Sequence, residues 1–138
     1  MNKTILVVDD IYPNRYVIEE LFEDYIVYGV ANGDEMRDLL KGIVPDIILM
    51  DVNLPQEDGY EIVKKLKSRD ETKDIPVIFL TVHNTRGDVM RAVNAGGVDF
   101  ITKPFDETDL RERVEKIFRE SSMKYQRGDG NYNTTVSN

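Results

Sequence analysis

Short apolar runs alternate along the chain with segments in which apolar residues recur at helical spacing. The runs have strand length and occupy residues 5–8, 26–30, 47–50, 77–80 and 99–102. The first, third and fourth are continuously apolar, a pattern typical of parallel strands that are covered on both faces. The second contains Tyr28 and Gly29, and the fifth is only partly apolar, so we predict that both lie at the sides of the sheet.

The segments between the runs predict five helices, because residues that favour helix ends stand at their boundaries. Proline suits the first turn of a helix, Asn and Asp suit the N-cap, and glycine suits the position after the last turn. Within the third segment, Ile62 and Leu66 are four residues apart and predict an inward face. The boundary residues are Pro13, Asn32 or Asp34, Gly42, Gly59, Gly96, Gly97 and Asp106.

Strand and helix alternate five times, so the predicted fold class is α/β, with a doubly wound parallel sheet and helices on both faces. The 138 residues suit one domain. We predict that this domain spans residues 1–120 and that its last helix fades by Glu120. Residues 121–138 are polar and lack periodicity, and we interpret them as a C-terminal tail or the start of a linker.

Composition excludes several classes of function. The chain has no cysteine, which excludes disulfides, zinc–thiolate sites and cysteine nucleophiles, and its single histidine, His83, excludes a multi-histidine metal site. Its net charge of −8, from 26 acidic and 18 basic residues, disfavours direct binding of nucleic acid. No segment has the apolar length of a signal peptide or membrane span, so we expect a cytoplasmic protein without a membrane partner.

Polar residues stand directly after the predicted strands: Asp9 and Asp10 after the first, Asp51 after the third, Thr81 after the fourth and Lys103 after the fifth. Ligands of open α/β sheets bind beyond these strand ends. Two carboxylates about 5 Å apart repel by roughly 3 kcal/mol at an effective dielectric near 20, so three of them favour a divalent cation such as Mg²⁺. Together with an ammonium and a hydroxyl, the set suits phosphoryl transfer to an aspartate nucleophile.

Each of these residues also has a plainer structural interpretation. Asp9 and Asp10 suit the cap of the following helix, and Asp51 suits a turn. Thr81 suits an ordinary strand end, and Lys103 suits a solvated loop whose backbone is extended by the following proline. Only their occurrence together favours the chemical interpretation.

Five segments carry a resemblance to a known family. They are Val7-Val8-Asp9-Asp10, Asp51-Val52-Asn53-Leu54-Pro55 with Asp58-Gly59, Thr81, Ala95-Gly96 and Lys103-Pro104-Phe105. In this order and spacing, over about residues 3 to 120, the sequence resembles the receiver domain of two-component response regulators, including chemotaxis regulators. The resemblance implies a flavodoxin-like (βα)5 three-layer sandwich with parallel strand order 2-1-3-4-5.

The resemblance also implies roles for the residues after the strands. Asp51 would accept a phosphoryl group from the phosphohistidine of a sensor histidine kinase or a phosphotransfer protein, in a reaction that needs Mg²⁺ and that the domain itself catalyses. Mg²⁺ would be the one cofactor, bound directly by Asp51 and Asp10. The remaining roles would be water-mediated metal binding by Asp9, metal binding by the backbone carbonyl of Asn53, and contacts of Thr81 and Lys103 with phosphoryl oxygens.

A conformational switch is a further implication of the resemblance. Thr81 would move toward the phosphoryl group, and the aromatic ring of Phe100 would swing inward behind it; core packing is the plainer interpretation of Phe100. The surface formed by the fourth helix, the fifth strand and the fifth helix would then bind an unidentified downstream protein, and the same surface allows a phosphorylation-dependent homodimer. Beyond its own phosphorylation and dephosphorylation, the domain would not be an enzyme.

Val82 departs from the family pattern, which usually has a small residue after the threonine. We expect its β-branched side chain to restrict access to the site and to slow phosphorylation by small donors such as acetyl phosphate. His83 is either an exposed loop residue or a second residue that controls the access of water to the acyl phosphate.

Three other functions compete with phosphoryl acceptance. A haloacid-dehalogenase-like phosphatase also uses aspartyl phosphate and Mg²⁺, but its nucleophile follows the first strand, whereas Asp51 follows the third. A flavin-binding module of similar fold would need a phosphate-binding loop rich in Ser, Thr and Gly after the first strand, and the sequence has no such loop there. A degenerate receiver that acts only as a protein-interaction module would not need the complete acidic set.

Overall fold

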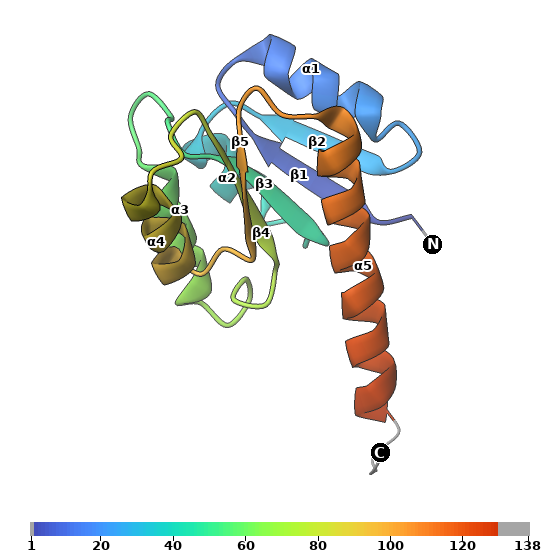
Figure 1. Ribbon diagram of the computed structural model, residues 1–138. Helices are drawn as coiled ribbons and strands as arrows, with labels where there is room; N and C mark the ends of the chain where they lie inside the picture. Colours follow the sequence, from blue (N-terminus) through green and yellow to red (C-terminus); the bar gives the residue numbers. More distant parts are fainter. Residues whose placement is uncertain (1, 130–138) are drawn as a thin grey trace. The chain divides into compact units, whose positions relative to one another are not determined.

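The computed structural model describes residues 2–129, with side chains described as far as Ser121. Five strands alternate with five helices (Figure 1). The strands are β1 (Thr4–Val8), β2 (Ile26–Val30), β3 (Ile47–Asp51), β4 (Val77–Thr81) and β5 (Asp99–Thr102). They form one parallel sheet in the order β2-β1-β3-β4-β5, which confirms the predicted flavodoxin-like topology.

Four helices belong to the same compact unit as the sheet, and this unit ends at Phe105. They are α1 (Tyr12–Leu21), α2 (Gly33–Leu39), α3 (Gly59–Lys67) and α4 (Arg86–Ala95). Two predicted helix starts are confirmed: Pro13 lies in the first turn of α1, and the Asn32 side chain caps α2 by accepting from the Glu35 N–H. The predicted end of α2 at Gly42 is wrong, because the helix ends at Leu39 and its C-cap is Leu40. Gly96 ends α4 in the left-handed region, at φ 100°, where a side chain would be strained.

The core follows from the alternation of side chains along the strands. Leu6, Val8, Ile48, Met50, Val77 and Phe79 share one face of the sheet and pack with buried residues of α2, α3 and α4. The residues between them, such as Ile5 and Leu49, are completely buried on the other face, which is the side of α1 (Figure 1). β1, β3 and β4 are therefore the central strands, and β2 is the half-exposed edge strand that its sequence predicts.

The fifth helix, α5 (Glu107–Asp129), belongs to a second unit that begins at Asp106. The Asp106 side chain accepts from the Asp109 N–H at 3.0 Å, so the predicted start of this helix is confirmed. The predicted end at Glu120 is wrong, because the helix continues to Asp129. Residues 121–129 lack apolar periodicity, the signal on which the prediction relied. The remainder of the predicted tail lies outside the described residues.

Among the described residues, none of the helices is both long and apolar enough for a membrane span.

Candidate functional site

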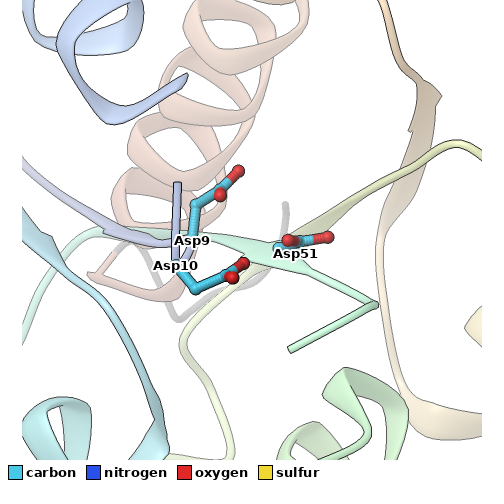
Figure 2. Close-up of side chains that lie close together, drawn as sticks. All are labelled: Asp9, Asp10 and Asp51. Atoms are coloured by element: carbon cyan, nitrogen blue, oxygen red, sulfur yellow. The ribbon is translucent and has the colours of Figure 1, made fainter. Parts of the chain in front are cut away.

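Three carboxylates gather beyond the carboxyl ends of β1 and β3 (Figure 2). Asp9 and Asp10 directly follow β1, Asp51 is the last residue of β3, and the two strands are neighbours in the sheet. One oxygen of each carboxylate lies within 4.8 Å of the others. Asp9 and Asp51 are buried and Asp10 is exposed, so the cluster opens to solvent on the Asp10 side. The sheet thus brings together the three aspartates predicted as metal ligands.

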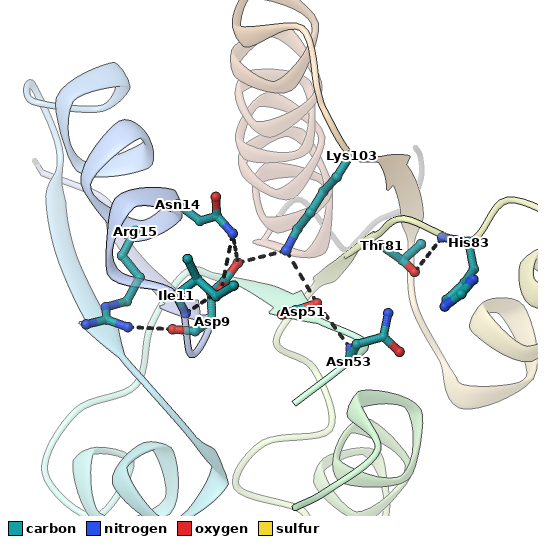
Figure 3. A network of polar contacts seen from close by, with 9 residues as sticks. All are labelled: Asp9, Ile11, Asn14, Arg15, Asp51, Asn53, Thr81, His83 and Lys103. Carbon is teal, nitrogen blue, oxygen red and sulfur yellow. Dashed lines mark hydrogen bonds and ion pairs between the residues drawn. The ribbon is translucent and has the colours of Figure 1, made fainter. Parts of the chain in front are cut away.

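Lys103 supplies the positive charge of the site. Its Nζ lies 2.9 Å from Oδ2 of Asp9 and 3.4 Å from Oδ1 of Asp51 (Figure 3). The backbone N–H of Lys103 donates to the carbonyl of Thr81 at 2.7 Å, and the peptide bond to Pro104 is cis. The lysine side chain is 15 % exposed, so its ammonium is shielded from bulk water where it faces the two carboxylates.

Asp9 forms hydrogen bonds with residues at the start of α1 as well as with Lys103. Its Oδ1 accepts from the Ile11 N–H at 2.9 Å, and its Oδ2 accepts from Nδ2 of Asn14 at 3.3 Å. Nη1 of Arg15 donates to the backbone carbonyl of Asp9 at 2.6 Å. The N-cap of α1 is Ile11 and has no side-chain cap hydrogen bond, so the interpretation of Asp9 and Asp10 as helix caps is wrong. The chemical role of Asp9 stays a prediction. Asn14 and Arg15 were not predicted as site residues, because nothing in their sequence spacing distinguishes them from ordinary helix residues.

Burial raises the pKa of the Asp51 carboxyl above its ordinary value. The Lys103 ammonium and a hydrogen bond from the Asn53 N–H lower the pKa, while the charge of Asp9 raises it further. The net effect is that the folded protein holds an ionised Asp51 less readily than water does. A cation bound beside the Asp51 carboxylate relieves this cost of ionisation, as does a reaction that removes the negative charge of the carboxylate.

The loop between β3 and α3 spans residues 52–58, and the backbone N–H of its second residue, Asn53, donates to Oδ1 of Asp51 at 3.1 Å. A single antiparallel bridge between Asn53 and Asp58 closes this loop on itself. Asn53 is exposed and lies beside Asp51, as Figure 3 shows. Its position is compatible with the predicted carbonyl ligand, and that role stays a prediction.

Thr81 ends β4, the strand beside β3, and is completely buried. Its hydroxyl oxygen accepts from the His83 N–H at 3.0 Å (Figure 3), which leaves the hydroxyl proton available to another acceptor. Val82 is 58 % exposed and His83 is also exposed. Phe100 is half-buried and packs against the core face that carries Phe79. The predicted roles of these residues in access and switching stay predictions.

Two arginines that the sequence did not single out bind the β3–α3 loop from different helices. Arg37 of α2 pairs with Glu57 at 3.0 Å, and Arg91 of α4 pairs with Asp58 at 2.6 Å. The paired residues are 20 and 33 positions apart in sequence, a separation at which charge patterning along one helix gives no signal.

The donor set fits a hard divalent cation. Magnesium prefers carboxylate and carbonyl oxygens and retains water ligands, and the site offers two buried carboxylates, an exposed one and a backbone carbonyl nearby. Uncompensated, the carboxylates repel one another, and one lysine offsets only part of their charge. The acidic triad is therefore able to bind a metal, beside an ammonium and a buried hydroxyl.

Comparison with known proteins places this arrangement in context. The family described as response regulator receiver domain matches residues 5–115. Sporulation initiation phosphotransferase F of Bacillus subtilis is 36 % identical over 118 residues, which are 84 % of this chain and 94 % of that protein. Response regulator PleD of Caulobacter vibrioides is 38 % identical over 121 residues, 86 % of this chain, but the chain spans only 27 % of PleD.

One solved structure with the same fold is described with a bound metal ion. The receiver domain of sensor histidine kinase PA1611 from Pseudomonas aeruginosa PAO1 superposes with a TM-score of 0.75 at 30 % identity. The match covers 84 % of this chain and 97 % of the other, which is described with a magnesium ion coordinated in its active-site cleft.

Proposed function

Because the chain belongs to the response regulator receiver family, which operates in phosphorelay signal transduction, we propose that Asp51 is its phosphoryl acceptor. A carboxylate oxygen of Asp51 forms a bond to phosphorus while the P–N bond of a phosphohistidine breaks. The electron pair of that bond stays on the imidazole nitrogen, which takes up a proton. The product is an acyl phosphate at the end of β3.

Receiver domains take their phosphoryl groups from histidine kinases or phosphotransfer proteins, and we propose such a protein as the donor here. No other substrate is turned over, and the catalysis that the domain supplies acts on its own Asp51. Lys103 is already placed between Asp9 and Asp51, and its ammonium offsets charge on the phosphoryl oxygens. The Thr81 hydroxyl donates its proton to one of those oxygens.

We assign the metal site to Mg²⁺, held by Asp10 and Asp51 with the backbone carbonyl of Asn53, while Asp9 acts through water. The exposure of Asp10 and the burial of Asp9 beneath Lys103 support this division. When bound, the ion supplies positive charge that offsets the phosphoryl oxygens and the carboxylates. The magnesium in the related receiver domain of PA1611 is consistent with this assignment.

The observation that carries the proposal is the environment of Asp51: a buried carboxylate 3.4 Å from an ammonium and within 4.8 Å of two further carboxylates. The test is incubation with phosphoramidate, whose P–N bond resembles that of phosphohistidine, followed by intact-protein mass spectrometry. We expect one phosphoryl group per chain with Mg²⁺, and none with excess chelator or in Asp51→Asn. Modification of the Asp51→Asn variant to the same extent would contradict the assignment.

Signalling requires that phosphorylation changes a binding surface, and we propose the α4–β5 surface for that role. On α4, Val89, Met90 and Val93 are exposed apolar side chains, which suit a protein target or a second copy of the domain. Thr81 and Phe100 are the proposed switch residues. Beryllofluoride, which mimics the acyl phosphate, should shift their amide NMR signals when Mg²⁺ is present, and unchanged signals would favour a degenerate receiver.

A further inference from the structure

Arg91 binds α4 to the beginning of α3 through two neighbouring residues. Its Nη2 lies 2.6 Å from Oδ2 of Asp58, and its guanidinium carbon lies 4.5 Å from the centre of the Tyr60 ring. The Tyr60 hydroxyl donates to the backbone carbonyl of Asp88, on α4, at 3.2 Å. We refer to Arg91, Asp58 and Tyr60 as the Arg91 cluster. Tyr60 is buried in the core, so the cluster has a rigid base.

Asp58 connects this cluster to the loop of the phosphoryl-acceptor site. Its other carboxylate oxygen accepts from the Tyr60 N–H at 2.8 Å and caps α3. Its backbone forms the bridge to Asn53, two residues after Asp51 in the sequence. One residue therefore holds three parts together: its backbone holds the site loop, and its side chain holds the start of α3 and the outer helix α4.

There is room for this loop to rearrange. A groove of ≈ 550 Å³ is lined by Asn53 and Asp58 on one side and by His83 and Arg91 on the other. The groove thus borders the loop after Asp51, the segment after Thr81 and α4. A shift of Asn53 on metal binding or phosphorylation would be passed to Asp58 through their bridge, and the ion pair would pass it to Arg91.

We propose that Arg91 is a positioning residue that couples the state of the Asp51 site to α4 and its apolar side chains Val89, Met90 and Val93. The inference rests on the proposed function and adds a route of communication besides Thr81 and Phe100. Coupling of two sites requires an element whose arrangement both of them bias. The Arg91 cluster is that element, because breaking its ion pair removes the direct link of Asp58 to α4 while the hydrogen bond of Tyr60 to Asp88 and the metal ligands stay in place.

The chain provides a matched control. Arg37 pairs with Glu57, the residue before Asp58, at 3.0 Å, but it extends from α2. The two arginine side chains are similarly exposed, at 43 % for Arg37 and 54 % for Arg91. Arg37→Gln and Arg91→Gln therefore each remove one ion pair from the same loop, and only Arg91→Gln removes a pair that joins it to α4. Arg37→Gln also removes a pair with Asp34 inside α2, at 2.7 Å.

The experiment measures amide NMR shift changes when Mg²⁺ and beryllofluoride are added to the wild type and to three variants: Arg91→Gln, Arg91→Lys and Arg37→Gln. In Arg91→Gln, we expect the response of residues 89–93 to fall by about twofold to fivefold, the range for a partly exposed ion pair. The response of Asp51 and Asn53 should persist. Arg91→Lys should retain most of the α4 response, because its ammonium still reaches Asp58, and Arg37→Gln should respond like the wild type.

A full α4 response in Arg91→Gln would overturn the proposal, as would an equal loss in Arg37→Gln, which would indicate a general loosening of the loop. Absence of any response at Asp51 and Asn53 in the wild type would instead overturn the proposed function, and the coupling with it. If Asp51, Asn53 and α4 all respond fully in Arg91→Gln, the proposed coupling is wrong but the proposed function stands.

Discussion

Replacing Lys103 with methionine tests the electrostatic balance of the site. Methionine has a similar length but no charge, so the substitution isolates the ammonium. In the wild type, this ammonium is 2.9 Å from Asp9, whose side chain is completely buried, and 3.4 Å from Asp51. Its removal leaves two buried carboxylates beside each other without their cation.

The size of the effect follows from these distances. At an effective dielectric near 20, the pairs at 2.9 and 3.4 Å attract by about 6 and 5 kcal/mol, while two carboxylate oxygens within 4.8 Å of each other repel by at least about 3.5 kcal/mol. Desolvation of the lysine offsets part of the attraction, and breaking a buried pair costs about 3–5 kcal/mol. The cost of leaving a carboxylate unpaired cannot exceed the cost of protonating it, which for an ordinary aspartate at pH 7 is about 4 kcal/mol. We therefore expect the free energy of unfolding to fall by about 2–4 kcal/mol.

Urea unfolding at pH 7, with and without Mg²⁺, is the assay for Lys103→Met. A bound divalent cation replaces part of the missing positive charge, so Mg²⁺ should reduce the difference in free energy of unfolding between Lys103→Met and the wild type. Lys64→Met is the control, because Lys64 forms an exposed pair with Glu61 on α3 and should change stability by less than about 0.5 kcal/mol. Equal stability of Lys103→Met and the wild type without Mg²⁺, or a difference that Mg²⁺ widens, would refute the reasoning.

Three further substitutions give measurable outcomes. Because burial raises the pKa of Asp51, the folded state binds more protons than the unfolded state, and stability is lost as the pH rises through the folded pKa. Asp51→Asn should therefore raise the thermal midpoint of the metal-free protein at pH 7, and the gain should vanish below the ordinary aspartate pKa; a lower midpoint at pH 7 would contradict this. Val82→Ala should accelerate phosphorylation by acetyl phosphate, and equal rates would show that Val82 does not restrict access. Gly59→Ala would bring a Cβ against the carbonyl oxygen of Asp51 and 2.9 Å from Cα of Val52. It should lower the free energy of unfolding in urea by about 1–3 kcal/mol, and unchanged stability would show that the backbone yields.

The strands and the sheet order are predictable from this sequence for different reasons. Continuous apolar runs such as residues 47–50 are typical of a strand covered on both faces, so the central strands follow from physical patterning. The order β2-β1-β3-β4-β5 follows from the family resemblance, because periodicity does not specify which strands are neighbours. The end of α5 is not predictable from periodicity, because its last turns lack apolar spacing.

The site divides in the same way. Asp9, Asp10, Asp51 and Lys103 are predictable, because parallel strands bring the residues after them to one edge. Their contacts are not, since hydrogen bonds such as that from Asn14 depend on how α1 begins. The ion pairs of the β3–α3 loop with α2 and α4 are also absent from any sequence motif, because each joins residues that meet only after the sheet has formed.

Chemical trapping identifies the residue that carries the phosphoryl group, which we propose to be Asp51. Borohydride reduces an aspartyl phosphate to homoserine, and peptide mass spectrometry then identifies the converted residue. After reaction with phosphoramidate and Mg²⁺, the account predicts homoserine at position 51 alone, and no conversion when Mg²⁺ is withheld. Conversion at Asp9, Asp10 or another acidic residue, or none at position 51 under conditions that add a phosphoryl group, would contradict it.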